Sequence, residues 1–237
     1  MGGRNGHMEV KPPTPAASQA GSHTPSGCPG SILITAGPTH EPIDAVRFIG
    51  NRSSGRLGVS LAEEAAREGW RVTLLLGPTP IQPSDSRIRV VRFRTTADLQ
   101  AALMAHLGDC DVLVMAAAVA DYRPKATPAD LEGKKRRVEG GMVIELESTP
   151  DLLAGAAQVR RADQLLVGFA LEPREEMEAS ARRKLAKKKV DMIVANPLAT
   201  MDAPTIEATV FGNEETGLSA GVSTGGPIAK DAFARWL

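Results

Sequence analysis

The stretch of chain best suited to bind an anion reads NRSSGRLG over residues 51–58. Its two glycines let the backbone approach a ligand closely, and its two serine hydroxyls can donate hydrogen bonds. A helix predicted over residues 54–69 starts here, and the first N–H groups of a helix lack internal partners and carry partial positive charge. A buried strand predicted at residues 31–35 precedes the loop. This order of strand, loop and helix predicts a phosphate or nucleotide site. The residues expected to bind phosphate are Ser53, Ser54, Gly55 and Gly58.

Further candidate site residues follow other predicted elements. A strand over residues 111–115 runs into three alanines at residues 116–118. Ligands of open α/β sheets lie beyond the carboxyl ends of the strands, so the alanines leave room for a flat group, although tight packing also explains them. Lys184 and Lys188 share one face of a predicted helix, where the helix dipole alone would favour them. The basic run at residues 134–137 is typical of a solvated surface patch.

The elements that must position these residues alternate between strand and helix, which predicts a parallel sheet with right-handed crossovers. The fold class is therefore α/β, with a Rossmann-like, doubly wound, mostly parallel sheet and helices on both faces. We expect a disordered leader at residues 1–30 and a single nucleotide-binding domain at residues 31–237, with a mobile basic loop at about residues 123–141. The predicted strands are 31–35, 71–76, 88–93, 111–115, 142–146, 165–171, 192–196 and about 209–211. The predicted helices are 54–69, about 95–107, one from about 150, 175–189, and one from 228.

Composition narrows the class of protein. The 237 residues include 28 Lys+Arg and 28 Asp+Glu, so no net charge draws the chain to nucleic acid or membrane. The 3% aromatic content argues against a protein that stacks nucleic-acid bases. No apolar run is long enough for a membrane span, and no metal-ligand cluster stands out. Two cysteines, Cys28 and Cys110, fit a reducing, cytoplasmic setting without a disulfide framework.

An ordered set of blocks is similar to the phosphopantothenoylcysteine synthetase family, the ligases of coenzyme A biosynthesis. The blocks are ITAGPTHEPIDAVRFIGNRSSGRLG, AAAVADYRP, the basic KKRR run, TPDLL, VGFALE, the lysine pair and DMIVAN, and they cover roughly residues 31–200. The resemblance implies a ligase that joins 4′-phosphopantothenate to cysteine. A nucleoside triphosphate first activates the carboxylate as an acyl-nucleotide with release of pyrophosphate, and cysteine then displaces the nucleotide. It also implies a homodimer, CTP in the bacterial type or ATP in the eukaryotic type, and Mg²⁺ carried on the phosphates.

The resemblance assigns catalytic roles to Asn51 and Lys134. Asn51 would donate its amide to the acyl oxygen, although an Asx turn is the ordinary interpretation of a loop Asn. Lys134 would close over the triphosphate. The family pattern is close to Lys-Ile-Lys-Lys and this chain has KKRR, so Lys135 stays open as an alternative. Arg47 lies four residues before Asn51, at the family's substrate-binding arginine.

Asp121 would select the base. A carboxylate accepts a hydrogen bond from an exocyclic amine such as N4 of cytosine, which favours CTP; capping of the following loop is the alternative role. Asp151 is expected to cap a helix, and Phe169 either stacks near the base or fills the core. The family's nucleotide site maps onto Gly37, Thr39, Met115, Ala116, Ala117, Ala118, Asp121, Lys134, Pro150, Asp151, Leu152, Leu153, Phe169, Lys184 and Lys188.

Two other functions fit parts of the sequence, but particular residues argue against each of them. A short-chain NAD(P) oxidoreductase needs a Tyr-x-x-x-Lys pair, but Tyr122 is followed four residues on by Ala126, and Gly77-Pro78 stands where an acidic residue would hold the ribose. A catalytically silent nucleotide-binding module would bind CTP without turnover. The presence of Asn51 and of the basic loop argues against it.

Overall fold

A computed structural model describes residues 29–137, 139–201 and 203–237 of the chain. The predicted leader therefore lies outside the described residues as far as residue 28. Among the helices in these ranges, none is long and apolar enough to cross a membrane.

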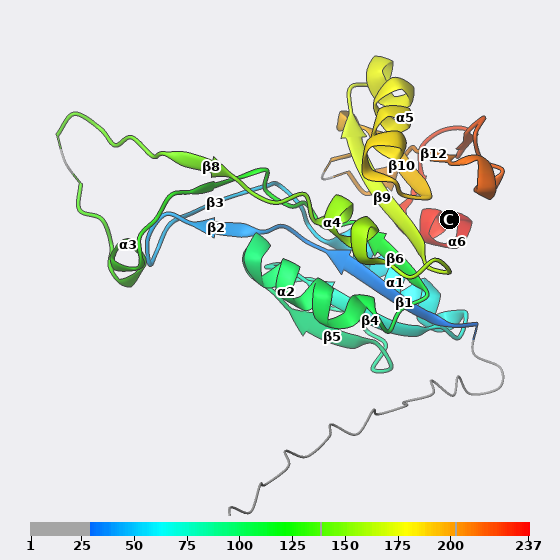
Figure 1. Cartoon of the computed structure of the whole chain (residues 1–237), viewed down its shortest axis with the longest axis horizontal. Helices are drawn as coiled ribbons and strands as arrows, with labels where there is room; N and C mark the ends of the chain where they lie inside the picture. The colour runs from blue at the N-terminus through cyan, green and yellow to red at the C-terminus, as the bar shows by residue number, and fades with distance from the viewer. Residues whose placement is uncertain (1–28, 138, 202) are drawn as a thin grey trace, which may run out of the picture.

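The centre of the molecule is an eight-stranded sheet with the order β13-β12-β10-β9-β6-β1-β4-β5 (Figure 1). Six strands are parallel: β1 (Ser31–Ala36), β4 (Arg71–Leu76), β5 (Arg89–Arg92), β6 (Val112–Met115), β9 (Leu165–Glu172) and β10 (Met192–Pro197). Antiparallel β12 (Thr209–Gly212) and β13 (Val222–Ser223) extend one edge. The near-continuous apolar runs of the central strands fit burial on both faces.

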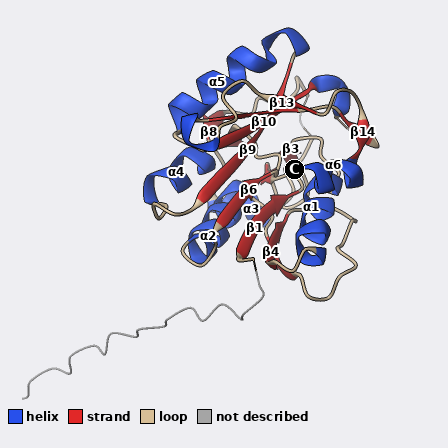
Figure 2. Ribbon diagram, turned by 90° about the vertical axis from the view of Figure 1, so that its right-hand side faces the viewer, coloured by secondary structure: helices blue, strands red, loops and turns tan. Residues whose placement is uncertain are grey.

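Helices cover both faces of the sheet (Figure 2). On one face, α1 (Arg56–Arg67) and α6 (Lys230–Trp236) bury Val59, Leu61 and Phe233. On the other, α2 (Thr96–Leu107), α4 (Leu152–Val159) and α5 (Met177–Lys188) close a second core that includes Leu103 and Leu153. The prediction of a Rossmann-like, doubly wound α/β fold is confirmed.

An arm extends away from the sheet (Figure 1). It consists of the ribbon β2 (His40–Pro42) with β3 (Phe48–Gly50), the ribbon β7 (Tyr122–Pro124) with β8 (Leu146–Ser148), and the short helix α3 (Pro128–Glu132). The prediction of a strand at residues 142–146 is wrong, because the strand starts at Leu146 and Val143 is 97% exposed. The region predicted as a loop at about residues 123–141 also contains α3, which begins with a capping box at Thr127.

Short elements complete the chain after residue 172. They are the 3-10 turns Arg174–Glu176, Leu198–Thr200 and Glu214–Thr216, and the ribbon of β11 (Thr205–Ile206) with β14 (Ile228–Ala229). The ribbon leads directly into α6. The terminal helix predicted from residue 228 thus begins two residues later, after the second strand of this ribbon.

Gly58 fixes how closely α1 approaches the sheet. A Cβ at this position would lie 2.5 Å from the Ala36 Cβ at the end of β1 and 3.1 Å from the Thr35 carbonyl oxygen. Real carbon atoms do not come so close, so a side chain at residue 58 would push the helix away from the strand. The helix start and the strand end are both parts of the predicted anion site, and their spacing depends on this glycine.

We expect Gly58→Ala to lower the free energy of unfolding by about 1–3 kcal/mol, because overpacking a closed contact forces the backbone to shift. Urea denaturation measures the change. The matched control is Gly155→Ala in α4, where an added Cβ has no atom within 4 Å. This control should gain about 0.5–1 kcal/mol, as expected for Gly to Ala in a helix interior. Equal stability of the two variants would contradict the packing role of Gly58.

Candidate active site

The candidate site lies where β1 and β6 end side by side at the reversal of strand order, the position at which doubly wound sheets bind ligands. Hydrogen bonds join the loops that leave the two strands. The Ala117 N–H donates to Thr35 Oγ1 at 3.0 Å, and the Ala118 N–H donates to the Gly37 carbonyl at 2.9 Å. The Ala120 N–H donates to the buried Thr39 Oγ1 at 3.0 Å. Gly37 and Thr39 line neither cleft described below, so they support the site from behind.

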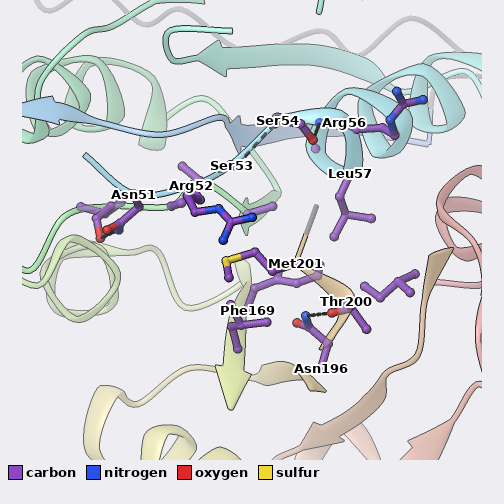
Figure 3. A pocket seen from close by; sticks show the side chains of 18 of the residues that line it. Asn51, Arg52, Ser53, Ser54, Arg56, Leu57, Phe169, Asn196, Thr200 and Met201 are labelled. Carbon is purple, nitrogen blue, oxygen red and sulfur yellow. Dashed lines mark hydrogen bonds between the residues drawn. The ribbon is translucent and has the colours of Figure 1, made fainter. Parts of the chain in front are cut away.

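The first cavity, which we call the α1 cleft, has a volume of about 620 Å³. One wall is the segment from Gly50 to Gly58, and the facing wall includes Asn196, Thr200 and Met201 (Figure 3). The three alanines, Asp121 and Phe169 also line it. The cleft therefore brings together the predicted phosphate-binding residues and the small residues that follow β6.

The start of α1 is arranged to receive an anion in this cleft. Gly55 takes the N-cap position with a φ of 74°, a left-handed conformation that favours glycine, and no side chain caps the helix. The first turn contains no acidic residue. The Ser53 and Ser54 hydroxyls accept only long hydrogen bonds of 3.4 Å from the Gly55 and Arg56 N–H groups. The backbone N–H groups at the helix start thus carry partial positive charge, and no carboxylate of the first turn competes for them.

Asn51 connects this wall to the segment after β6. Its Nδ2 donates to the Val119 carbonyl at 2.9 Å, and the side chain is exposed. The amide therefore spans two loops rather than closing a local turn. An Asn amide has two N–H donors, so the second remains for a ligand in the cleft.

The second cavity, which we call the α4–α5 cleft, has a volume of about 270 Å³. Its lining gathers ten of the predicted nucleotide-binding residues, and three of them, Ala117, Asp121 and Phe169, also line the α1 cleft. The ten are Met115, Ala117, Asp121, Pro150, Asp151, Leu152, Leu153, Phe169, Lys184 and Lys188. Two adjacent subsites, each with its own helix start, therefore meet at Asp121 and Phe169.

Two ion pairs flank the α4–α5 cleft. Lys188 Nζ lies 2.9 Å from Asp151, whose carboxylate also accepts from the Ala154 N–H and so caps α4, as predicted. Burial alone would raise the pKa of Asp151, but the Lys188 and Ala154 hydrogen bonds and the nearby lysine charges lower it overall. Lys184 Nζ lies 2.5 Å from Glu172.

Asp121 is exposed and lines both cavities. Its backbone carbonyl accepts from the Thr149 N–H at 2.9 Å. Within the described part of the chain its carboxylate has no hydrogen-bond partner and caps no loop, so both oxygens can accept from a ligand. This placement agrees with a role in recognising the base of a nucleotide.

Arg47 and Lys134 lie on the arm and line neither cleft. Arg47 pairs with the buried Asp44 and also donates to the Lys135 carbonyl at 2.8 Å. The hydrogen bond of Arg47 is the main cause of a strong lowering of the Asp44 pKa, against the effect of burial. Lys135 pairs with Asp130 at 2.8 Å, whereas the Lys134 ammonium has no ion-pair partner among the described residues. Of the two candidate lysines, Lys134 is the one available to a ligand.

Sequence reasoning missed several residues of the α1 cleft. Asn196 lies next to the last residue of β10, in the DMIVAN block, and could have been found because it is near the carboxyl end of a parallel strand, at the edge where ligands bind. Lys230, 8% exposed at the start of α6, and Met201 come from the region after residue 200, whose short strands have no clear periodicity. Among the described residues, no group of three or more His, Cys, Asp or Glu side chains could hold a metal ion.

Comparisons with known proteins find relatives of this chain in sequence and in fold. The family model of the DNA/pantothenate metabolism flavoprotein C-terminal domain matches residues 29–231. The chain is 46% identical over 167 residues to a cysteine/cysteine sulfinic acid decarboxylase of an unknown prokaryotic organism, a match covering 70% of this chain and 45% of that protein. It is 38% identical over 184 residues to the coenzyme A biosynthesis bifunctional protein CoaBC of Bacillus subtilis (strain 168), covering 76% of this chain and 44% of that protein.

Among solved structures, the C-terminal domain of a CoaBC protein superposes with a TM-score of 0.73 at 35% identity, covering 88% of this chain and 92% of that one. Of the two curated relatives, by contrast, the chain spans less than half the length of each.

The Asp151–Lys188 pair generates a prediction about pH. The folded state lowers the pKa of Asp151, so the ionised group stabilises the fold above its unfolded pKa of about 4, and this contribution is lost as the pH falls through the folded value. We expect the difference in unfolding free energy between wild type and Asp151→Asn to be constant near neutral pH and to shrink below about pH 4. Urea denaturation at several pH values measures it. In a Lys188→Met background the same comparison should give a smaller difference, and an unchanged one would contradict the pairing.

Proposed function

The chain belongs to the DNA/pantothenate metabolism flavoprotein C-terminal domain family, and on that premise we propose that it is a phosphopantothenate–cysteine ligase of coenzyme A biosynthesis. The carboxylate of 4′-phosphopantothenate attacks the α-phosphorus of a nucleoside triphosphate and pyrophosphate leaves. The amine of cysteine then attacks the acyl carbon of the acyl-nucleotide and the nucleoside monophosphate leaves. One curated relative is named a decarboxylase and the other a bifunctional protein, and each is more than twice as long as the segment that matches this chain. We therefore assign only the ligase half-reactions to this chain.

The observation that carries the proposal is the meeting of two anion subsites. Phosphopantothenate and the nucleoside triphosphate are both anions, and the ligase must bring the carboxylate of one to a phosphate of the other against their repulsion. The α1 cleft offers the helix start and serine hydroxyls for the phosphate of phosphopantothenate. The α4–α5 cleft offers two lysines and the start of α4 for the triphosphate. Their common lining at Ala117 and Asp121 is where the carboxylate and the α-phosphate would meet.

Asn51 and Asp121 are the residues we assign closest to the reaction. The free N–H of the Asn51 amide would donate to the acyl oxygen, whose charge grows as cysteine attacks. The carboxylate of Asp121 would accept from the exocyclic amine of cytosine, which favours CTP over ATP.

We infer that a homodimer completes the site, with Arg47 and Lys134 of the arm acting on a bound substrate. In a single chain both residues lie outside the clefts. The arm exposes Val46, Phe48 and Tyr122, apolar surface suited to contact with another chain.

The reaction is expected to use Mg²⁺, which would neutralise phosphate charge and orient the leaving pyrophosphate. The described residues form no cage for a metal ion. They fit an ion carried mainly by the triphosphate itself, as Mg²⁺ often is.

The decisive experiment is to measure pyrophosphate release by the purified protein with Mg²⁺, 4′-phosphopantothenate and either CTP or ATP, with and without cysteine. We expect release with CTP, and CMP together with the cysteine conjugate only when cysteine is present. Activity with ATP alone would keep the ligase and overturn the assignment of Asp121. Nucleotide binding without any release would identify a silent binding module instead.

For Asn51 we expect a loss of turnover with little loss of binding. Asn51→Ala should lower kcat by about 10²–10³-fold, the usual effect of removing one donor to a developing oxyanion. The Kd for CTP, measured by calorimetry, should stay within about twofold, because the amide is directed at the acyl group. An equal loss in CTP affinity and in kcat would mean that Asn51 acts on the nucleotide.

A further inference from the structure

The two lysines of the α4–α5 cleft are held by carboxylates in different places. Lys188 pairs with Asp151, which itself lines the cleft. Lys184 lines the cleft too, but its partner Glu172 lines neither cavity. The carboxylate that holds Lys184 therefore does not itself line the space that a ligand would fill.

The contacts of Glu172 fix it firmly. It is the last residue of β9, and its side chain is 15% exposed. One carboxylate oxygen accepts from Ser180 Oγ at 2.7 Å and from Lys184 Nζ at 2.5 Å. Ser180 and Lys184 are four residues apart and share one face of α5, so a single carboxylate holds two successive turns of the helix. Burial raises the pKa of Glu172, but the hydrogen bonds from Lys184 and Ser180 and the nearby positive charges outweigh it and lower the pKa, so the group stays ionised at neutral pH.

The ion pair with Glu172 orders the Lys184 side chain before any ligand enters the cleft. A lysine ammonium has three donors, and Glu172 takes one of them. Ordering a free lysine side chain costs rotamer entropy, which a ligand must otherwise offset when it binds. Where the fold already orders the side chain, that cost does not reduce the affinity for the ligand.

We propose that Glu172 is a positioning residue for nucleotide binding, which holds the Lys184 ammonium at the α4–α5 cleft in place to meet the phosphates of the triphosphate. The inference rests on the proposed function, because it takes the ligand of this cleft to be a nucleoside triphosphate. It assigns Glu172 an effect on phosphate affinity that acts only through Lys184.

The test compares the Kd of CTP and of CMP, each with Mg²⁺, for wild type and Glu172→Gln by calorimetry. ATP and AMP replace them if ATP proves to be the active nucleotide. We expect Glu172→Gln to weaken CTP binding about tenfold, the effect of losing a hydrogen bond between charged groups. CMP, which lacks the outer phosphates, should be affected less than twofold. Glu172→Asp, which keeps the charge, should recover part of the loss, and Ser180→Ala should show a smaller loss than Glu172→Gln.

A double-mutant cycle separates positioning from a general structural effect. In a Lys184→Met background, Glu172→Gln should weaken CTP binding no further, because the residue through which Glu172 acts is gone. The matched control is Glu178→Gln, which breaks the exposed Glu178–Arg182 pair on the same helix and should leave both affinities unchanged.

The outcomes separate the inference from the proposed function. If the wild-type protein binds neither CTP nor ATP, the proposed function fails. If it binds CTP but Glu172→Gln binds it equally well or more tightly, Glu172 does not position Lys184, while the ligase assignment stands. A further loss in the double variant beyond Lys184→Met would also overturn the inference. If Glu172→Gln does not fold, the affinities of Ser180→Ala and Glu172→Asp for CTP test the inference instead. Normal CTP affinity in both of these variants would reject the positioning role of Glu172.

Discussion

The site depends first on how the loops after β1 and β6 are joined. Three N–H groups of the segment after β6 donate to the end of β1 and to the loop that follows it. The Ala117 and Ala120 N–H groups donate to the hydroxyls of Thr35 and Thr39, respectively, and the Ala118 N–H donates to the Gly37 carbonyl. These hydrogen bonds are buried or half-buried, so losing one would leave an unsatisfied polar group at a cost of about 1–3 kcal/mol. They place the alanine segment against the start of α1, and they direct the carbonyl of Val119 toward the Asn51 amide. The shape of both clefts follows from this one connection.

The cationic side chains of the α4–α5 cleft are already ordered by the fold itself. Lys184 pairs with the carboxylate at the end of β9, and Lys188 pairs with the carboxylate at the start of α4. The α1 cleft instead relies on the uncapped start of α1, which carries positive potential without a mobile side chain. The two clefts thus differ in the source of their positive potential, which is ordered side chains in one and fixed backbone groups in the other.

The sheet and its helices could be predicted because their apolar runs and periodicity are strong. Topology placed the loop after β1 and the alanines after β6 at one edge of the sheet, whereas the family resemblance supplied the candidates in β9 and α5. The arm could not be predicted. Its strands β2, β3, β7 and β8 are three residues each and pair only as two-stranded ribbons, so no core imposes an apolar pattern. The C-terminal wall of the α1 cleft was missed for the same reason, since β11 and β14 are two residues each and Lys230 directly follows the second of them.

The ion pair between Arg47 and Asp44 constrains the role proposed for Arg47. Asp44 is buried and accepts from the Arg47 guanidinium and from the N–H groups of Val46, Arg47 and Lys135. Withdrawing the Arg47 side chain alone would leave that buried carboxylate without its charged partner, which is costly. Arg47 can therefore reach a substrate more easily with this pair intact than by breaking it. A substrate carboxylate that approaches the arm from another chain would add a ligand to the guanidinium without separating it from Asp44. This favours contact between two chains over movement of one side chain into its own cleft.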